Sequence, residues 1–194
     1  MKKQTLFLIL LLSLNFIKAQ NVQNYYFSHS IGSYVETSAT ATLLSSVRAD
    51  DAISSAQNIG FNFVYDGSTY TQFKMSSNGF ISFGTGSNSR ISNTFTSALY
   101  SSSRPFIAPL WDDLSGTSTN SVAAYEVTGS APNRVLTVEW RNWFWDKNAA
   151  TNPIPNPTIS FQVKLYETTN AIEFCYGTSN FGGMTASIGI SNSA

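Results

Sequence analysis

Apolar and polar side chains alternate along many short stretches of this chain with a period of two residues. Phe61, Phe63 and Tyr65 share one phase and lead into Asp66-Gly67. An Asp-Gly pair between two alternating runs is a strong signal for a two-residue hairpin turn. The pattern therefore predicts a strand that ends at Tyr65 and a return strand from Tyr70 to Met75.

The same alternation continues to the end of the chain. After the turn Ser76-Ser77-Asn78-Gly79, a short apolar strand is expected from Phe80 to Phe83. Later runs have their apolar residues at Leu136, Val138 and Trp140, at Phe161, Val163 and Leu165, at Ile172, Phe174 and Tyr176, and at Ala186, Ile188 and Ile190. Turn residues stand between them at Ala131-Pro132-Asn133 and Thr168-Thr169-Asn170.

These runs indicate the fold class. Successive side chains of a strand point to opposite faces, so each run buries one face and leaves the other for solvent. Two such sheets can bury their apolar faces by packing against each other. The mature chain has no sustained run of apolar residues at helical spacing, and only one helical turn is expected, near Ser97 to Tyr100. We predict an all-β fold, an antiparallel β-sandwich of about ten strands.

Two stretches interrupt the alternation. Gly84 to Arg104 is rich in Ser, Gly and Asn, and it is long for a connection without structure of its own. It is expected to be either a binding loop or a packed surface loop. Asp146 to Thr158 contains three prolines, which cannot donate to a central ladder, so it is expected to be a surface loop.

The first nineteen residues have the three parts of a secretory signal peptide. Lys2 and Lys3 precede an apolar run from Leu6 to Leu14, and a small residue, Ala19, stands at the expected cleavage position. Polar residues interrupt the run before it reaches the about 20 residues that a membrane-spanning helix needs. We predict that residues 1–19 are removed on export and that residues 20–194 form one domain, secreted or at the cell surface.

The net charge limits the classes of binding partner, and the cysteine content indicates the kind of organism that would export the protein. The whole chain has 11 basic and 11 acidic side chains, and loss of Lys2, Lys3 and Lys18 leaves a net charge of −3. So weak a balance argues against nucleic acid or an anionic membrane as the main partner. Cys175 is the only cysteine, so no intrachain disulfide can form, which fits a bacterial exported protein better than an animal one.

Three ordered segments resemble the nidogen-like extracellular (NIDO) domain. They are Ser77-Asn78-Gly79-Phe80-Ile81-Ser82-Phe83-Gly84, then Ile107-Ala108-Pro109-Leu110-Trp111-Asp112-Asp113, then Leu136-Thr137-Val138-Glu139-Trp140. The segments Phe161 to Leu165 and Ala186 to Ile190 follow in the same order. The resemblance covers residues 59–190. It implies a context of adhesion and extracellular matrix, with no shared catalytic residues.

The leader, an expected strand from Tyr26 to Tyr34 and the abundance of Ser, Thr and Asn also resemble modular secreted proteins of Bacteroidetes. Those proteins often carry Ig-like repeats and a type IX sorting domain. This chain stops at Ala194 without such a domain. The difference raises the hypothesis that it is the N-terminal module of a longer protein.

Asp112 and Asp113 are the candidates for a metal site. Adjacent carboxylates can contribute to a Ca²⁺ site, which takes six to eight oxygen ligands. Neighbouring residues of an extended segment point to opposite sides, however, and no DxDxDG-type loop surrounds the pair. The alternative is an aspartate that accepts backbone N–H groups in a turn. We therefore expect no cofactor, with Ca²⁺ as the weaker hypothesis.

Catalytic chemistry has few candidates in this sequence. A glycosidase needs two carboxylates across the scissile bond, and Glu139 or Glu173 are available without a spacing that selects them. A Ser-His-Asp site would require His29, the single histidine. Cys175 alternates out of phase with Phe174, so it is expected to be an inert, buried or half-buried thiol. These patterns favour a protein that is not an enzyme.

The region from Trp140 to Trp145 supplies the candidate binding residues. Trp140 shares the phase of Leu136 and Val138, so it is expected in the core. Trp143 and Trp145 have the opposite phase, so if the strand continues they face away from the core with Arg141, and one hypothesis is that they form an exposed aromatic platform. The alternative is that the N-terminal segment covers both indoles, since large aromatic side chains are usually buried.

The favoured function is a non-catalytic extracellular recognition or adhesion module for a protein or glycan ligand. The alternatives are an accessory or catalytic part of a secreted hydrolase that acts on polysaccharide or protein, and a structural spacer between modules. The sequence reading frame beyond Ala194 would discriminate among them.

Overall fold

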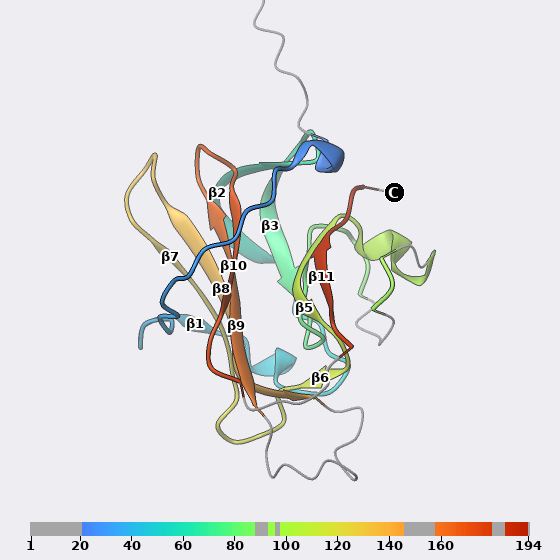
Figure 1. The fold of residues 1–194 in the computed structure, drawn as a ribbon, viewed down its shortest axis with the longest axis vertical. Coiled ribbons are helices and arrows are strands. Elements are labelled where there is room, and N and C mark those ends of the chain that lie inside the picture. The colour runs from blue at the N-terminus through green and yellow to red at the C-terminus, as the bar shows by residue number, and fades with distance from the viewer. Residues whose placement is uncertain (1–20, 88–92, 96–97, 146–157, 180–184, 194) are drawn as a thin grey trace, which may run out of the picture.

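Two antiparallel sheets face each other across one main hydrophobic core (Figure 1). The structure is a computed structural model, and it describes residues 21–87, 93–95, 98–145, 158–179 and 185–193. These residues contain eleven strands and three short 3-10 helices. The predicted all-β sandwich is therefore confirmed, and the predicted leader, residues 1–19, lies outside the described residues.

The first sheet has six strands. Its order is β1 (Thr42–Leu43), β7 (Val122–Thr128), β8 (Val135–Trp145), β9 (Ile159–Tyr166) and β10 (Ile172–Tyr176), and β6 (Leu114–Ser115) pairs with the end of β8. The three central strands, β7, β8 and β9, are 7, 11 and 8 residues long, and β8 pairs with both of its neighbours.

The second sheet has five strands in the order β11 (Ser187–Ile190), β5 (Phe106–Trp111), β4 (Ile81–Ser82), β3 (Ser68–Met75) and β2 (Gln57–Tyr65). The 3-10 helices are η1 (Val22–Asn24), η2 (Ser45–Val47) and η3 (Ala98–Ser103). The last of these coincides with the helical turn expected near residues 97–100.

The predicted hairpin between β2 and β3 is confirmed. Tyr65 pairs with Ser68, so only Asp66 and Gly67 form the turn. Both have positive φ, 47° and 75°, as a type I′ turn requires. Asp and Gly are among the residues that tolerate this backbone region, which is why this pair fixes the register of the hairpin.

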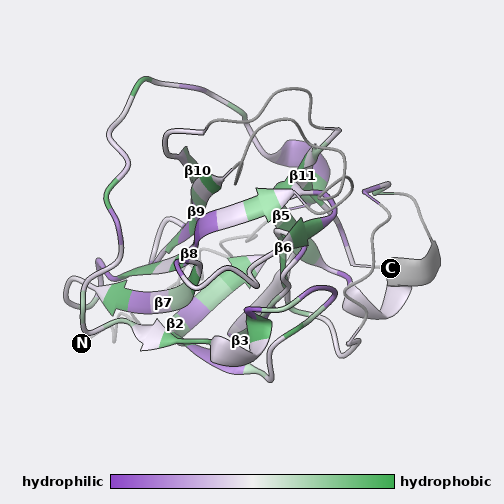
Figure 2. Ribbon diagram, turned by 90° about the horizontal axis from the view of Figure 1, so that it is seen from below, coloured by the Kyte–Doolittle hydropathy of each residue, from purple (hydrophilic) through white to green (hydrophobic). Residues whose placement is uncertain are grey.

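The core consists of the inward faces of both sheets. Figure 2 shows hydrophobic and hydrophilic positions intermixed along the strands, as an alternating pattern requires. The largest fully buried side chains of this core include Phe63, Tyr65, Phe73, Trp140, Trp143 and Phe161. Trp140 stacks on Phe161 of the neighbouring strand with ring centroids 4.9 Å apart, so the predicted core position of Trp140 is confirmed.

A second, smaller cluster is formed by β5 and the residue that precedes β4, and it explains why β5 is buried along its whole length. Phe80, Phe106 and Trp111 form it, and Phe95 packs against Phe106 and Trp111 with centroid distances of 5.4 and 5.5 Å. Phe95 belongs to the long segment 84–104. For its described part, this segment is therefore a packed surface loop.

The turn Ser76-Ser77-Asn78-Gly79 joins the two sheets. The peptide oxygens of Ser76 and Ser77 accept hydrogen bonds from the indole Nε1 atoms of Trp140 and Trp143, each at 2.8 Å. Asn78 accepts the backbone N–H of Leu114 at 2.9 Å and donates to Asp51 at 2.8 Å. A polar turn at the centre of the sandwich is thus satisfied by the strands on both sides.

The alternation predicted for β11 does not hold throughout. Ile188 is 53% exposed, although its phase placed it with Ala186 and Ile190 on the buried face. The pairing of β11 with β5 shifts between Ser187 and Gly189, opposite the stretch of β5 that contains Pro109. Proline has no N–H to donate to the ladder, and an irregularity there turns the neighbouring side chain away from the core.

Candidate functional site

The aromatic platform predicted at Trp143, Trp145 and Arg141 is not present as an exposed surface. Trp143 is fully buried in the main core, and Trp145 is half-buried and packs against the same cluster. A methyl group on Gly116 would lie 2.3 Å from the Trp143 ring, so a glycine is needed beside the indole. The predicted exposure of these two indoles was therefore wrong.

A β-bulge is the cause of this error. Trp140 pairs with Phe161 and Trp143 with Ile159, so β8 uses one residue more than β9 between the two pairs. Asn142 takes up the extra residue with a left-handed φ of 56°. The phase is shifted beyond the bulge, which returns Trp143 to the core face. The adjoining loop, predicted at Asp146 to Thr158, falls outside the described residues except for its last position.

Asp112 serves the turn after β5. One of its oxygens accepts the N–H of Asp113 at 2.8 Å, and the other accepts the N–H and the hydroxyl of Thr185 at 3.2 and 3.1 Å. These contacts agree with the alternative in which the aspartate accepts backbone N–H groups in a turn. Among the residues that the structure describes, no group of three or more His, Cys, Asp or Glu side chains is placed to hold a metal ion.

Glu139 is a buried carboxylate on the outer face of β8, on the opposite side from the core tryptophans. It accepts the Tyr34 hydroxyl at 2.6 Å, the Thr37 hydroxyl at 2.5 Å and the Gln162 amide at 2.8 Å. The Arg141 Nε lies 3.7 Å away. A buried charge is tolerated only when it is paired and hydrogen-bonded, and Glu139 meets both conditions.

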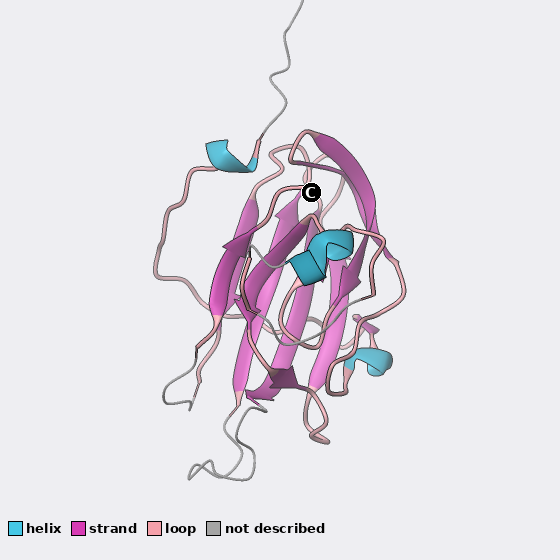
Figure 3. Cartoon of the chain, turned by 90° about the vertical axis from the view of Figure 1, so that its right-hand side faces the viewer, coloured by secondary structure: helices cyan, strands magenta, loops and turns pink. Residues whose placement is uncertain are grey.

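The partners of Glu139 belong to the N-terminal strap, which we define as residues 26–37. The strap is extended, and no backbone–backbone hydrogen bond joins it to the described part of the chain, so the strand predicted from Tyr26 to Tyr34 is not formed. Figure 1 shows it crossing in front of the six-stranded sheet, and Figure 3 shows it as a separate arc beside the strands. The strap therefore depends on side chains for its attachment.

The strap is attached at both ends. Before it, Val22 and Tyr25 pack on the core, and the Val22 N–H donates to Asp66 at 3.2 Å. At its other end, burial, the hydrogen bond to Glu139 and the negative charge of that residue raise the pKa of the Tyr34 hydroxyl. Tyr34 thus stays protonated and keeps donating to the carboxylate.

Between these attachments the strap exposes large apolar side chains. Tyr26 is 93% exposed, Phe27 79%, Ile31 105% and Val35 68%. His29, the single histidine, lies exposed on the same segment. Large apolar side chains this exposed within ten residues are unusual for a soluble surface, and such groups tend to mark interaction sites.

Sequence reasoning missed this surface because it treated residues 26–34 as a strand. The available signal was the lack of alternation: Tyr26 and Phe27 are adjacent, and Ser28, Ser30, Gly32 and Ser33 surround Ile31. Of the other candidate groups, Cys175 is half-buried as predicted, and burial raises the pKa of its thiol. Glu173 is exposed on β10 and accepts the Tyr166 hydroxyl.

Comparison with known proteins gives one match. A family model described as NIDO related matches residues 24–194. No curated protein and no solved structure matches the chain. Within the described residues, no helix has the length and apolar character to cross a membrane.

Proposed function

This chain belongs to the NIDO-related family, and from that premise we propose that it is a non-catalytic extracellular recognition module whose contact surface is the N-terminal strap. The observation that carries the proposal is the exposure of Tyr26, Phe27, Ile31 and Val35 on a segment attached at both ends. The ligand is an extracellular protein or glycan.

The way the strap is held suits it for binding. Asp66 and the core restrain its start, and Glu139 restrains Tyr34 and Thr37 at its end. A segment that is already ordered loses less conformational entropy on association than a free tail. Aromatic side chains such as Tyr26 and Phe27 add large contact areas with few rotatable bonds. The strap thus combines a restrained backbone with accessible apolar groups.

Export is part of the same proposal. The leader pattern of residues 1–19 supports cleavage after Ala19, which places Gln20 at the start of the mature chain. Mature protein recovered from the culture medium or cell surface of the native host should begin at Gln20 or within a residue or two of it. Recovery of the folded extracellular protein with Met1 and the intact leader would contradict export by cleavage.

Binding assays with immobilised matrix proteins and a glycan array test the contact surface. The mature chain is compared with a variant that carries Tyr26→Ser, Phe27→Ser, Ile31→Ser and Val35→Ser. We expect at least a tenfold loss of binding, because truncation of central apolar anchors costs about 2 kcal/mol or more each when they are hot spots. The melting temperature should change little, since these side chains are exposed.

The matched control replaces exposed apolar residues elsewhere. Leu43→Ser and Ile188→Ser change side chains that are 65% and 53% exposed on β1 and β11. This control should bind as the unmodified chain does. Equal binding by the strap variant, or equal losses in the strap and control variants, would reject the strap as the contact surface.

A further inference from the structure

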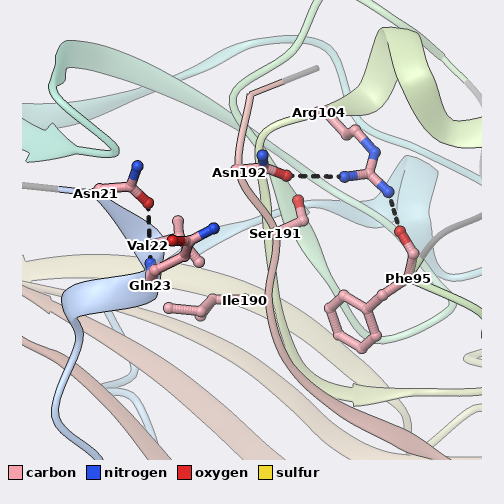
Figure 4. Close-up of a pocket in the computed structure, with 8 residues that line it drawn as sticks. All are labelled: Asn21, Val22, Gln23, Phe95, Arg104, Ile190, Ser191 and Asn192. Atoms are coloured by element: carbon pink, nitrogen blue, oxygen red, sulfur yellow. Dashed lines mark hydrogen bonds between the residues drawn. The ribbon is translucent and has the colours of Figure 1, made fainter.

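A small pocket lies where the two ends of the described chain meet. It has a volume of roughly 310 Å³ and is lined by Asn21, Val22, Gln23, Phe95, Arg104, Ile190, Ser191 and Asn192 (Figure 4). We call it the Arg104 pocket. Its size is at the lower end of the range for small-molecule sites, which suits one sugar unit better than a folded partner.

Arg104 provides the charge of this pocket. Its guanidinium donates to the side-chain oxygen of Asn192 at 3.1 Å and to the peptide oxygen of Phe95. It also lies over the Phe106 ring, with the guanidinium carbon 5.8 Å from the ring centroid. These contacts fix the direction of a group with five N–H donors and leave some of them unused.

Arg104 lacks the counter-charge that Arg134 and Arg141 have. Arg134 pairs with Glu167 at 2.6 Å, and Arg141 pairs with Glu36 and Glu139. No carboxylate of the described residues lies within 4 Å of Arg104. A held guanidinium without a protein carboxylate is complementary to a carboxylate from outside, which it can bind through two parallel hydrogen bonds.

The other lining residues indicate what carries that carboxylate. Asn21, Gln23 and Asn192 contribute side-chain amides, which both donate to and accept from hydroxyl groups. Figure 4 shows the Phe95 ring on the same side as Arg104, across from Asn21 and Gln23. We propose that the Arg104 pocket binds an acidic sugar unit, with Arg104 on its carboxylate, the amides on its hydroxyls and the Phe95 ring against its apolar face.

This site goes beyond the proposed function of the strap and does not depend on it. None of the four exposed apolar residues of the strap lines the pocket. The quadruple strap variant should therefore keep acidic-sugar binding, and pocket variants should keep binding through the strap. Either site can fail without affecting the other.

An NMR titration of the mature chain tests the pocket. The ligands are the methyl glycosides of glucuronic acid and of N-acetylneuraminic acid, with methyl glucoside and acetate as neutral and non-sugar controls. We expect saturable shifts of the side-chain amide signals of Asn21, Gln23 and Asn192 with at least one acidic sugar. For a single sugar unit, the dissociation constant should be on the order of 1 mM. The two acidic ligands distinguish a uronic acid from a sialic acid.

Variants then assign the interaction. Arg104→Gln should weaken binding at least tenfold, and Arg104→Lys should restore part of it. Gln23→Ala changes an exposed lining residue without touching Arg104, so it tests the pocket even if Arg104→Gln folds poorly. Arg48→Gln is the matched control, because Arg48 is exposed and also donates to backbone oxygens, those of Ser118 and Thr119.

Three results would overturn the proposal. One is the absence of saturable shifts up to about 50 mM acidic sugar, well above the expected dissociation constant. Another is equal binding of methyl glucoside or acetate. The third is unchanged binding by both Arg104→Gln and Gln23→Ala.

Discussion

At the scale of single residues, Gly79 allows the buried turn to pass close to β5. Its φ is +78°, and a methyl group there would lie 1.8 Å from the peptide oxygen of Leu110. The turn peptide also accepts the N–H of Leu110 at 3.3 Å. Only a residue without a side chain satisfies both the backbone conformation and the close approach.

Gly79→Ala should therefore destabilise the domain by more than about 2 kcal/mol, through left-handed strain and displacement of β5. Gly32→Ala is the matched control, because nothing lies within 4 Å of the added methyl group. It should change stability by no more than about 0.5 kcal/mol. Urea denaturation of both variants measures the difference, and similar midpoints would contradict the role of Gly79.

At the scale of elements, the strap is held on β8 by the buried carboxylate of Glu139 and by the ion pair between Glu36 and Arg141. Glu139 receives donors from Tyr34 and Thr37 on the strap and from Gln162 on β9, while Gln162 also donates to the peptide oxygen of Val35 at 2.7 Å. The outer face of the sheet thus holds an otherwise unpaired segment through a single polar cluster. Removal of the charge should release that segment selectively.

Glu139→Gln should cost about 1.5–3 kcal/mol, the range for hydrogen bonds to a charged group, and should speed hydrogen exchange at the Thr37 amide. Glu173→Gln is the control, since Glu173 is exposed on β10 and its main partner is the Tyr166 hydroxyl. Hydrogen exchange followed by mass spectrometry compares the two variants with the unmodified chain. Unchanged exchange in residues 34–37 of Glu139→Gln would show that the strap is held by other contacts.

The elements also show what the sequence could predict. Burial alternates along β2 and at the apolar positions of β9, so their faces were assigned correctly from Phe61, Phe63, Phe161 and Val163, although the pairing of β2 with β3 shifts between Asn58 and Phe63. β8 and β11 each contain a shift in pairing register, and the alternation of apolar and polar residues does not reveal where such a shift occurs. Trp143 and Ile188 were therefore placed on the wrong faces.

The candidate site was harder to predict than the strands. Glu139 alternates as a solvent-facing residue of β8, yet the strap covers it. That contact joins residues more than a hundred positions apart, and local pattern has no information on such a pairing. The exposure of Tyr26 and Phe27 depends on the same long-range attachment of the strap, so it could not be predicted from the local sequence pattern either.

At the scale of the whole molecule, Asp66 connects both ends of the described chain. Its Oδ1 accepts the N–H of Val22 at 3.2 Å, and its Oδ2 accepts the N–H and hydroxyl of Ser193 at 2.8 and 2.7 Å. Partial burial acts to raise the pKa of this carboxyl, but the hydrogen bonds from Ser193 and Val22 outweigh it, so the pKa is lowered.

A lowered pKa in the folded state fixes the sign of the pH dependence. The contribution of Asp66 to stability is present above its ordinary pKa and is lost as the pH falls through the lower folded-state value. From pH 5 to pH 2, the unmodified chain should lose about 0.5–1 kcal/mol more than Asp66→Asn, a modest difference because the carboxylate is largely solvent-screened. Asparagine tolerates the left-handed φ at this position. Thermal denaturation of the two chains at a series of pH values measures this difference. If their stabilities fall equally between pH 5 and pH 2, Asp66 does not contribute to the pH dependence.

We expect the same carboxylate to bear the first load when the domain is pulled at its two ends. A pull applied at residues 22 and 193 meets the hydrogen bonds of Asp66 first, because both residues are fastened to the turn between β2 and β3. The load would peel the two ends away from one edge and would not shear the long ladders of β7, β8 and β9. We therefore expect the ends to detach at a lower force than the one that unfolds the core.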